Sequence, residues 1–422
     1  MDAKNLLIIF IVIRMVQFFA ERHLSRLNRN YYLNTQNRDL AMKTLNISSE
    51  DMEKTLAYTE DKYKFGQFSS YFSIVVTLLF IGLGGLGYFE SLAKALVNSF
   101  NGSSPLIIGA VFFTLLMFAS MLVGLPFKLY STFKIEEKHG YNKQTVPSFF
   151  SDMAKQLILG AIIGLPMICG LLWIMNAMGE KWWLWAWIAM SSFSLLIAWI
   201  YPTFLAPIFN KFSPVADAEL KDKIEVLAKK IGFKTDGLYV MDASKRSSHG
   251  NAYFTGVFGK KRIVLFDTLI ESMKSNEIVA VLAHELGHFK LNHVRWQLLR
   301  GIAMTGLTFY VLSLCLPLEN FYRAFALDGV SNYGALVVFG LWFGITDFIL
   351  QPLESLMSRS NEFAADEFAK QNVGNSEDLC NALLKLREKS NVMPISHPVY
   401  SAFYHSHPPL MERLGAMGFQ AK

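Results

Sequence analysis

The chain has 422 residues, of which 52% are hydrophobic and only 18% are charged. Soluble domains carry about 25% charged residues, so this composition excludes an ordinary soluble enzyme and favours several membrane-spanning helices. The net charge of +6 does not indicate a nucleic-acid partner, because the basic residues are spread over loops between apolar segments. The three cysteines are far apart and include no Cys-x-x-Cys pair, which argues against a disulfide framework or a thiolate zinc site.

Seven apolar segments are long enough, or nearly long enough, to cross a bilayer, which takes roughly 20 helical residues. The first is short, can extend past Glu21, and carries Arg14 in its middle, which argues against a cleaved signal peptide. Pro166 and Pro202 are expected to kink their helices. The predicted spans lie near Asn5–Ala20, Phe68–Phe89, Leu106–Tyr130, Leu157–Met178, Trp183–Leu205, Leu298–Leu318 and Ala335–Leu353.

Basic residues alternate between the loops that join these spans. The loops after the first, third and fifth spans are rich in Lys and Arg, whereas the other three carry almost none. Because basic loops stay on the cytoplasmic side, the odd-numbered loops and the C-terminal segment are predicted to be cytoplasmic. The N-terminus is predicted to face the opposite side.

The long fifth loop has the pattern of a small α+β domain. Leu220–Ile231 is typical of an amphipathic helix, and Gly237–Met241 and Arg262–Phe266 are typical of short strands. Asn251–Val257 lies between them and is expected to be an exposed edge strand. The predicted parts of the chain are 1–209 with five spans, 210–297 as a small cytoplasmic domain, 298–354 with two spans, and 355–422 as a cytoplasmic C-terminal part.

The segment His284-Glu285-Leu286-Gly287-His288 matches the HExxH pattern of zinc peptidases. Histidines four residues apart share one helix face, so both imidazoles can bind one Zn²⁺, and Glu285 can reach a water on that metal. The motif lies within Ser275–Val294, which is predicted to be one helix capped by Ser275. His293 lies off the shared face and is expected to be structural or to support a ligand.

A catalytic zinc takes three protein ligands and leaves a position open for water. Glu362 is the best candidate for the third ligand, because it lies on a predicted helix, Ser360–Gln371, just after the last span. Asp366 is one turn further on the same face, where it can accept a hydrogen bond from a ligand histidine. The alternative is that both acids belong to a solvated helix face, which the HExxH motif disfavours.

The remaining catalytic groups follow from the chemistry of zinc hydrolysis. A zinc-bound water has a pKa of about 7, and Glu285 is predicted to act as the general base that takes its proton. The oxyanion needs a donor besides the metal, for which His405, His407 and Arg413 are candidates. The rigid Pro408-Pro409 turn can hold His407 in place, but a purely structural histidine stays equally open.

Arg14 and Asp347 lie inside predicted spans, where charged groups are costly and normally face the protein interior or a wet cavity. They line a water-filled chamber, or they pair with polar groups of neighbouring helices; both readings stay open. A transporter or channel that uses them is a distant alternative function, because the sequence has no internal repeat. An inactive scaffold is disfavoured, since Glu285 and every predicted ligand are present.

In these residues the chain resembles the type I CAAX prenyl proteases, which are integral-membrane HExxH zinc endopeptidases. The resemblance covers nearly the whole chain, with seven spans in the same relation to the motifs, and Gly250 stands where the family usually has Ser. Besides HExxH, the matching segments are Ile135–Thr145, Phe209–Phe212, Ser247–Phe254, Glu362–Asp366 and His407–Arg413.

The resemblance implies a mainly α, polytopic membrane protein whose seven helices enclose a large intramembrane chamber, capped on the cytoplasmic side by the zinc site. It implies that Glu362 is the third ligand and that His407 and Arg413 lie near the active site. It also implies that Asn251, Ala252 and Tyr253 pair with the substrate backbone by β-strand addition.

The expected partners are the lipid bilayer and a peptide or protein substrate, without nucleic acid. In eukaryotic members the substrate carries a prenylated C-terminal CaaX motif, from which the last three residues are removed. The short loops favour a bacterial member in the inner membrane, for which quality control of membrane proteins without prenyl specificity is the alternative; a eukaryotic member would lie in the endoplasmic reticulum membrane. The smaller heat-shock membrane proteases are disfavoured because they have fewer spans.

Overall fold

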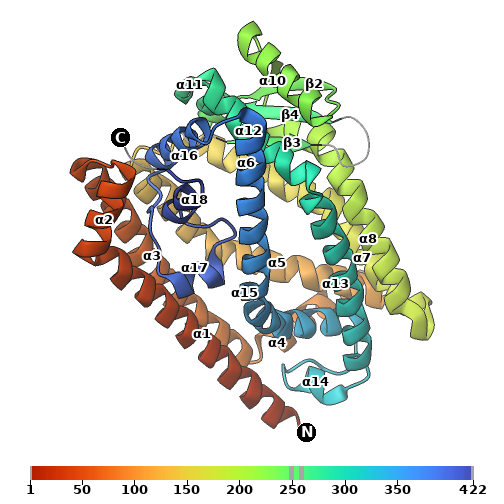
Figure 1. Ribbon diagram of the computed structural model, residues 1–422. Helices are drawn as coiled ribbons and strands as arrows, with labels where there is room; N and C mark the ends of the chain where they lie inside the picture. Colours follow the sequence, from red (N-terminus) through yellow and green to blue (C-terminus); the bar gives the residue numbers. More distant parts are fainter. Residues whose placement is uncertain (1, 247–250, 256–260, 420–422) are drawn as a thin grey trace.

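The computed structural model describes residues 2–246, 251–255 and 261–419. In this part of the chain, seven helical segments are long and apolar enough to cross a membrane, which confirms the predicted number of spans (Figure 1). They consist of α1 (Ala3–Leu33), α3 (Ser49–Gly82), α5 (Pro105–Tyr130), α6 (Val146–Leu159) with α7 (Leu165–Ala177), α8 (Trp182–Ile200) with α9 (Ala206–Phe209), α13 (His293–Cys315) and α15 (Asn332–Val373).

The shorter elements connect these spans or form a small domain that contains the sheet. The helices are α2 (Thr35–Leu45), α4 (Gly85–Ser99), α10 (Ala218–Ile231), α11 (Asp267–Ser272), α12 (Ser275–Lys290), α14 (Glu319–Arg323), α16 (Glu377–Ser390), α17 (Pro398–Tyr404) and α18 (Leu410–Ala416). The strands are β1 (Phe212–Pro214), β2 (Gly237–Met241), β3 (Ala252–Thr255) and β4 (Arg262–Phe266).

Several spans differ in their ends from the predicted ones. α1 and α3 extend many residues beyond their apolar parts: within α1 a charged stretch follows the apolar part, and within α3 a charged stretch precedes it. The predicted span Phe68–Phe89 is interrupted, because Gly84 has a φ of +74° and ends α3 before α4 begins. This left-handed conformation suits glycine, and a Cβ there would lie only 3.3 Å from the Cβ of Ala326.

Both prolines that were expected to disturb their helices lie at π-helical turns. The segment Gly160–Gly164 precedes α7, whose second residue is Pro166. Pro202 lies within the π-helical segment Tyr201–Leu205 between α8 and α9. Proline cannot donate the i→i−4 hydrogen bond, so a wider turn is a physical consequence of its position.

The four strands form one sheet of order β1-β2-β4-β3, in which β2 and β4 are parallel and the other neighbours antiparallel. β2 and β4 have the predicted bounds, and β3 lies at the edge as expected, although Val257 falls outside the described residues. The sheet, α10, α12 and α16 share one hydrophobic core, which includes Ile224, Ile263, Leu265 and Ile278, all at most 1% exposed. α16 packs on α12.

Two differences near the HExxH motif matter for the site. The predicted helix Ser275–Val294 is in fact two helices, since Asn292 adopts a φ of +60° and His293 begins α13. Ser275 is already helical and is not a cap; instead the Glu277 carboxylate accepts the Lys274 backbone N–H at 2.7 Å. Conversely, the last span and the separately predicted helix Ser360–Gln371 are parts of one 42-residue helix, α15.

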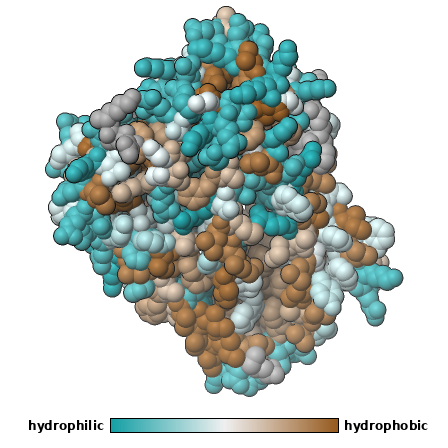
Figure 2. Space-filling model, in the orientation of Figure 1, coloured by the Kyte–Doolittle hydropathy of each residue, from teal (hydrophilic) through white to brown (hydrophobic). Residues whose placement is uncertain are grey.

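The surface divides into an apolar and a polar region (Figure 2). On the face shown, hydrophobic residues gather over the lower half, and hydrophilic residues cover the upper part around the sheet. Only 6% to 28% of the residues in the most apolar stretches of the spans are buried, so most of these apolar residues keep part of their surface exposed. The protein is therefore a multi-pass membrane protein with a small sheet-containing domain at one end.

Candidate active site

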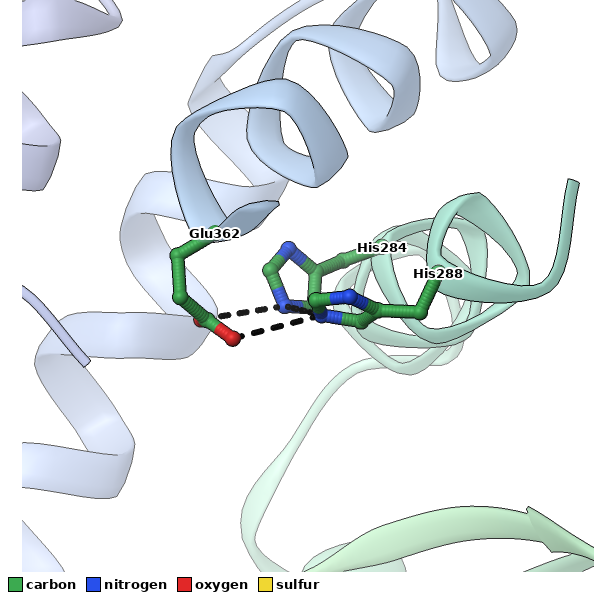
Figure 3. Close-up of side chains that lie close together, drawn as sticks. All are labelled: His284, His288 and Glu362. Carbon is green, nitrogen blue, oxygen red and sulfur yellow. Dashed lines mark hydrogen bonds and ion pairs between the residues drawn. The ribbon is translucent and has the colours of Figure 1, made fainter. Parts of the chain in front are cut away.

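The facing helices α12 and α15 bring three predicted metal ligands together (Figure 3). The Nε2 atoms of His284 and His288 are 3.3 Å apart. Glu362 places Oε2 at 3.5 Å from His284 Nε2 and Oε1 at 3.3 Å from His288 Nε2. One ligand atom from each of the three side chains can thus contact the same ion.

The surroundings of these atoms fit a bound metal. His284 and Glu362 are only 6% and 3% exposed, respectively. Glu362 Oε2 is buried and receives no hydrogen bond of good geometry, although His407 Nδ1 lies 2.7 Å away. A buried carboxylate oxygen without a proper donor is costly unless it binds a cation. Two imidazoles and a carboxylate are the donor set of catalytic zinc sites, so the residues present fit Zn²⁺.

Asp366 and Arg413 support the ligand His284 from behind. Asp366 Oδ1 lies 2.8 Å from His284 Nδ1, as the predicted second carboxylate should. The Arg413 guanidinium makes two hydrogen bonds to Asp366, from Nε at 2.8 Å and from Nη2 at 2.6 Å. Its Nη1 lies 3.6 Å from Glu362 Oε2. Arg413 therefore lies at the site, but as a buried group held by Asp366.

His407 approaches the metal ligands from the segment that precedes α18. Its side chain is 66% exposed, and Nδ1 lies 2.7 Å from Glu362 Oε2. The two prolines that follow it are buried, so the rigid turn that was expected to hold His407 is anchored in the protein. His405 is different: its ring packs against Tyr400 at 5.6 Å, and burial lowers its pKa. Of the two histidines, only His407 contacts the site.

Glu285 lies on a wall of a cavity of about 540 Å³, together with His288, Glu362 and Tyr253. Burial is the main cause that raises the pKa of Glu285, against the lowering effect of the two histidines. Burial also lowers the pKa of His284, but its hydrogen bonds to Asp366 and Glu362 outweigh this effect and raise the pKa to about 9. A perturbed carboxyl group in a cavity beside a metal-binding cluster is typical of a catalytic base.

The edge strand β3 borders the same cavity. Asn251 O accepts the Phe266 N–H at 3.0 Å, and Ala252 and Tyr253 pair with Leu265 and Val264. Because hydrogen-bonded pairs alternate in an antiparallel ladder, the backbone groups of Ala252 face the open edge and those of Tyr253 face β4. Asn251 Oδ1 accepts the Ala252 N–H at 2.8 Å. Gly250 lies outside the described residues.

Two further contacts lie at or near the site, and only the second was not predicted from the sequence. His293 Nδ1 lies 3.0 Å from His288 Nδ1, so the histidine that was read as structural or supporting contacts a ligand from the next helix. Arg246 connects the segment before β3 to the membrane helices, with Nε 2.9 Å from Asp152 Oδ2 and Nη1 3.2 Å from Asn210 Oδ1. Asp152 and Arg246 lie far apart in the sequence, and no local pattern marks this pair.

The two charged residues inside spans lie apart from the site. Arg14 is half-buried and Asp347 is exposed. Neither makes an ion pair or a hydrogen bond with another residue in the described part of the chain. Among the described residues the structure therefore shows no pairing of either side chain with a neighbouring helix, and the alternative that they line a water-filled chamber stays a prediction.

The chain matches two family models in succession. Residues 30–211 match the model described as CAAX prenyl protease N-terminal, five membrane helices, and residues 214–418 match that of peptidase family M48. It is 39% identical to the CAAX prenyl protease 1 homolog of Arabidopsis thaliana, with 89% of each chain covered. It is 37% identical to CAAX prenyl protease 1 of Saccharomyces cerevisiae, with 88% of this chain and 87% of the relative covered.

A solved structure agrees over the full length. The crystal structure of S. mikatae Ste24p is similar with a TM-score of 0.92 and 34% sequence identity, and the match covers 98% of this chain and 99% of that chain. The membrane helices, the sheet domain and their mutual placement are thus shared with a structure of known fold.

Proposed function

The chain belongs to peptidase family M48, as a CAAX prenyl protease 1 homologue, and from this premise we propose how its residues perform the reaction. It is a multi-pass integral-membrane metalloendopeptidase. We assign a single Zn²⁺ to His284, His288 and Glu362, the three ligands that converge between α12 and α15. Bound zinc would supply a Lewis acid for the scissile carbonyl and an acidified water.

The other catalytic roles belong to side chains near the metal ligands. Glu285 is the general base: it takes the proton of the attacking water and delivers it to the leaving amine. Its position on the cavity wall beside two ligands supports this role. His407 is largely exposed, with Nδ1 2.7 Å from Glu362 Oε2, and is the donor to the developing oxyanion. Arg413 and Asp366 orient His284, and Asp366 has the role of supporting carboxylate.

The substrate binds in an extended conformation along β3. The open edge at Ala252 offers a backbone N–H and C=O for strand addition, and the Asn251 side chain, which now accepts the Ala252 N–H, would give way to the substrate carbonyl. Tyr253 contributes its side chain to the cavity wall and shapes a subsite. Extended binding places a peptide bond over Glu285 because the strand borders the cavity that contains it.

The proposed substrate is the prenylated C-terminal CaaX segment of a protein, from which the last three residues are removed. The relatives in Arabidopsis thaliana and Saccharomyces cerevisiae are CAAX prenyl proteases, which supports this class of substrate. The basic loops support an active site on the cytoplasmic face, with the seven helices around an intramembrane chamber for the lipid group. The alternative is proteolysis of membrane proteins without prenyl specificity, in a bacterial inner membrane or an endoplasmic reticulum membrane.

The deciding experiment is cleavage of one CaaX peptide, farnesylated and unmodified, by the purified protein beside Glu285→Ala. Cleavage by the wild type alone, with a preference for the farnesylated peptide, is the expected result. Equal rates on both peptides would replace the prenyl protease proposal by the general protease. Cleavage that survives in Glu285→Ala would overturn the assigned base.

A further inference from the structure

A second cavity, of about 850 Å³, lies between α3 and the π-helical turn Ser131–Glu136 that follows α5. It shares no lining residue with the cavity that contains Glu285. Its walls combine four aromatic rings, Phe65, Phe68, Phe127 and Tyr130, with a rim of lysines. We call it the interfacial groove.

The aromatic rings of the interfacial groove pack against one another, but two of them remain largely exposed. Phe65 stacks on Tyr130 with ring centroids 5.1 Å apart, and Phe127 lies 6.0 Å from Phe68. Phe68 remains 63% exposed and Tyr130 52% exposed. Aromatic rings that face an open groove gain free energy when an apolar chain covers them.

The rim of the interfacial groove carries an excess of positive charge, with three lysines and one aspartate. Lys138 is paired with Asp61 at 2.6 Å, and Asp61 also contacts His139 Nε2 at 2.8 Å. The Asp61 carboxylate therefore already has two partners. Lys64 and Lys134 are exposed, and neither makes an ion pair with any described residue. The nearby Glu60 carboxylate is already bonded to Arg29 and Tyr32. The groove therefore presents two ammonium groups without an ion pair among the described residues, above an aromatic wall.

The sequence places this arrangement at the membrane surface. Charged residues of α3 end at Lys64 and its apolar span follows, while the apolar span of α5 ends at Tyr130 before Lys134. Both helices thus leave the apolar layer at the groove, where aromatic residues and lysines mark the interface with water. The loop after the turn connects to the protease domain, since the Lys143 N–H donates to Arg246 O at 3.3 Å.

We propose that the interfacial groove binds an anionic glycerophospholipid from the leaflet on the side of the metal centre. The phosphate lies between Lys64 and Lys134, and an acyl chain covers Phe68 and Phe127. Charge complementarity selects an anionic headgroup, and the position at the bilayer surface selects a lipid over a soluble ligand. A bound lipid would bridge α3 and the turn that carries Glu136, whose carboxylate accepts the Tyr58 hydroxyl at 2.8 Å.

The test compares lipid binding by the full-length protein in detergent, measured by native mass spectrometry with phosphatidylglycerol and phosphatidylcholine of the same acyl chains. The variant is Lys64→Gln/Lys134→Gln. The matched control is Lys62→Gln/Lys128→Gln, which removes two lysines from the same helix ends that do not line the groove. Wild type and control should retain phosphatidylglycerol preferentially, and the variant should bind it more weakly by about fivefold for each lysine.

Two further experiments distinguish binding of a whole lipid from binding of a soluble anion or a general effect of surface charge. Phe127→Ala keeps both lysines and should weaken phosphatidylglycerol binding, because the acyl chain loses its wall. Soluble glycerophosphate should not compete. Equal losses in the control and the variant, or full competition by glycerophosphate, would overturn the proposal. Because no groove residue lines the active site, this outcome is independent of whether the peptide is cleaved.

Discussion

Asp366 on α15 orients His284 on the facing helix α12: Asp366 Oδ1 lies 2.8 Å from His284 Nδ1. Since a carboxylate can only accept, this contact assigns the proton to Nδ1 and leaves the lone pair of Nε2 for the metal. Arg413 keeps Asp366 ionised and in place through its two hydrogen bonds. The ligand geometry of α12 thus depends on residues of α15 and α18.

Asp366→Asn tests this dependence. Asparagine fills the same space but weakens the contact with His284, so we expect zinc affinity to fall by about 10- to 100-fold. Competition with a chromogenic chelator measures the zinc affinity. Glu367→Gln is the matched control, because Glu367 is an exposed neighbour whose nearest ion pair, with Lys370, spans 4.0 Å. An unchanged affinity in Asp366→Asn would remove Asp366 from the metal centre.

Glu285→Ala separates catalysis from metal binding. We expect zinc content to stay near that of the wild type and kcat to fall by at least about 10²- to 10⁴-fold, because the general base is lost. His284→Ala should lose both zinc and activity. Elemental analysis beside peptide hydrolysis gives both quantities. A Glu285→Ala protein without zinc would mean that Glu285 is a ligand and not the base.

Zinc affinity should depend on pH through His284, whose pKa is raised to about 9 in the metal-free chain. Zinc must displace this proton, so below pH 9 the affinity should rise with pH, by up to about tenfold per pH unit, and it should level off above pH 9. Titration with a zinc buffer across this range measures the slope. Affinity that is flat between pH 7 and 9 would show that His284 is already neutral.

His407→Gln should lower kcat by about 10²- to 10³-fold with little change in zinc content, since His407 contacts Glu362 from the exposed side and is not one of the three ligands. The matched control is His405→Gln, two residues earlier, whose ring packs on Tyr400. Steady-state kinetics on one peptide distinguishes the two. Equal losses in both variants would indicate damage to the segment before α18 and no specific role for His407.

Local patterns in the sequence predicted the elements well. The spans follow from long apolar runs, and β2 and β4 follow from short apolar runs between turn residues. Pro166 and Pro202 indicated where two helices are disturbed, but not that the disturbance takes the form of π-helical turns. The HExxH pair follows from helical periodicity alone. The break at Asn292 escaped prediction because its left-handed backbone leaves no periodic signal, and the union of the last span with Ser360–Gln371 escaped because a polar stretch within a helix looks like a loop.

The sequence by itself therefore determined the residue types of the metal centre and their spacing within each helix, since these depend on residues one or two turns apart. Only the tertiary structure decided that α15 crosses α12 where Glu362 meets His284 and His288, and that Arg413 reaches Asp366. Only the tertiary structure, likewise, places Lys64 and Lys134 at the rim of one groove. Such contacts depend on how helices far apart in the chain pack, and no local period records that packing.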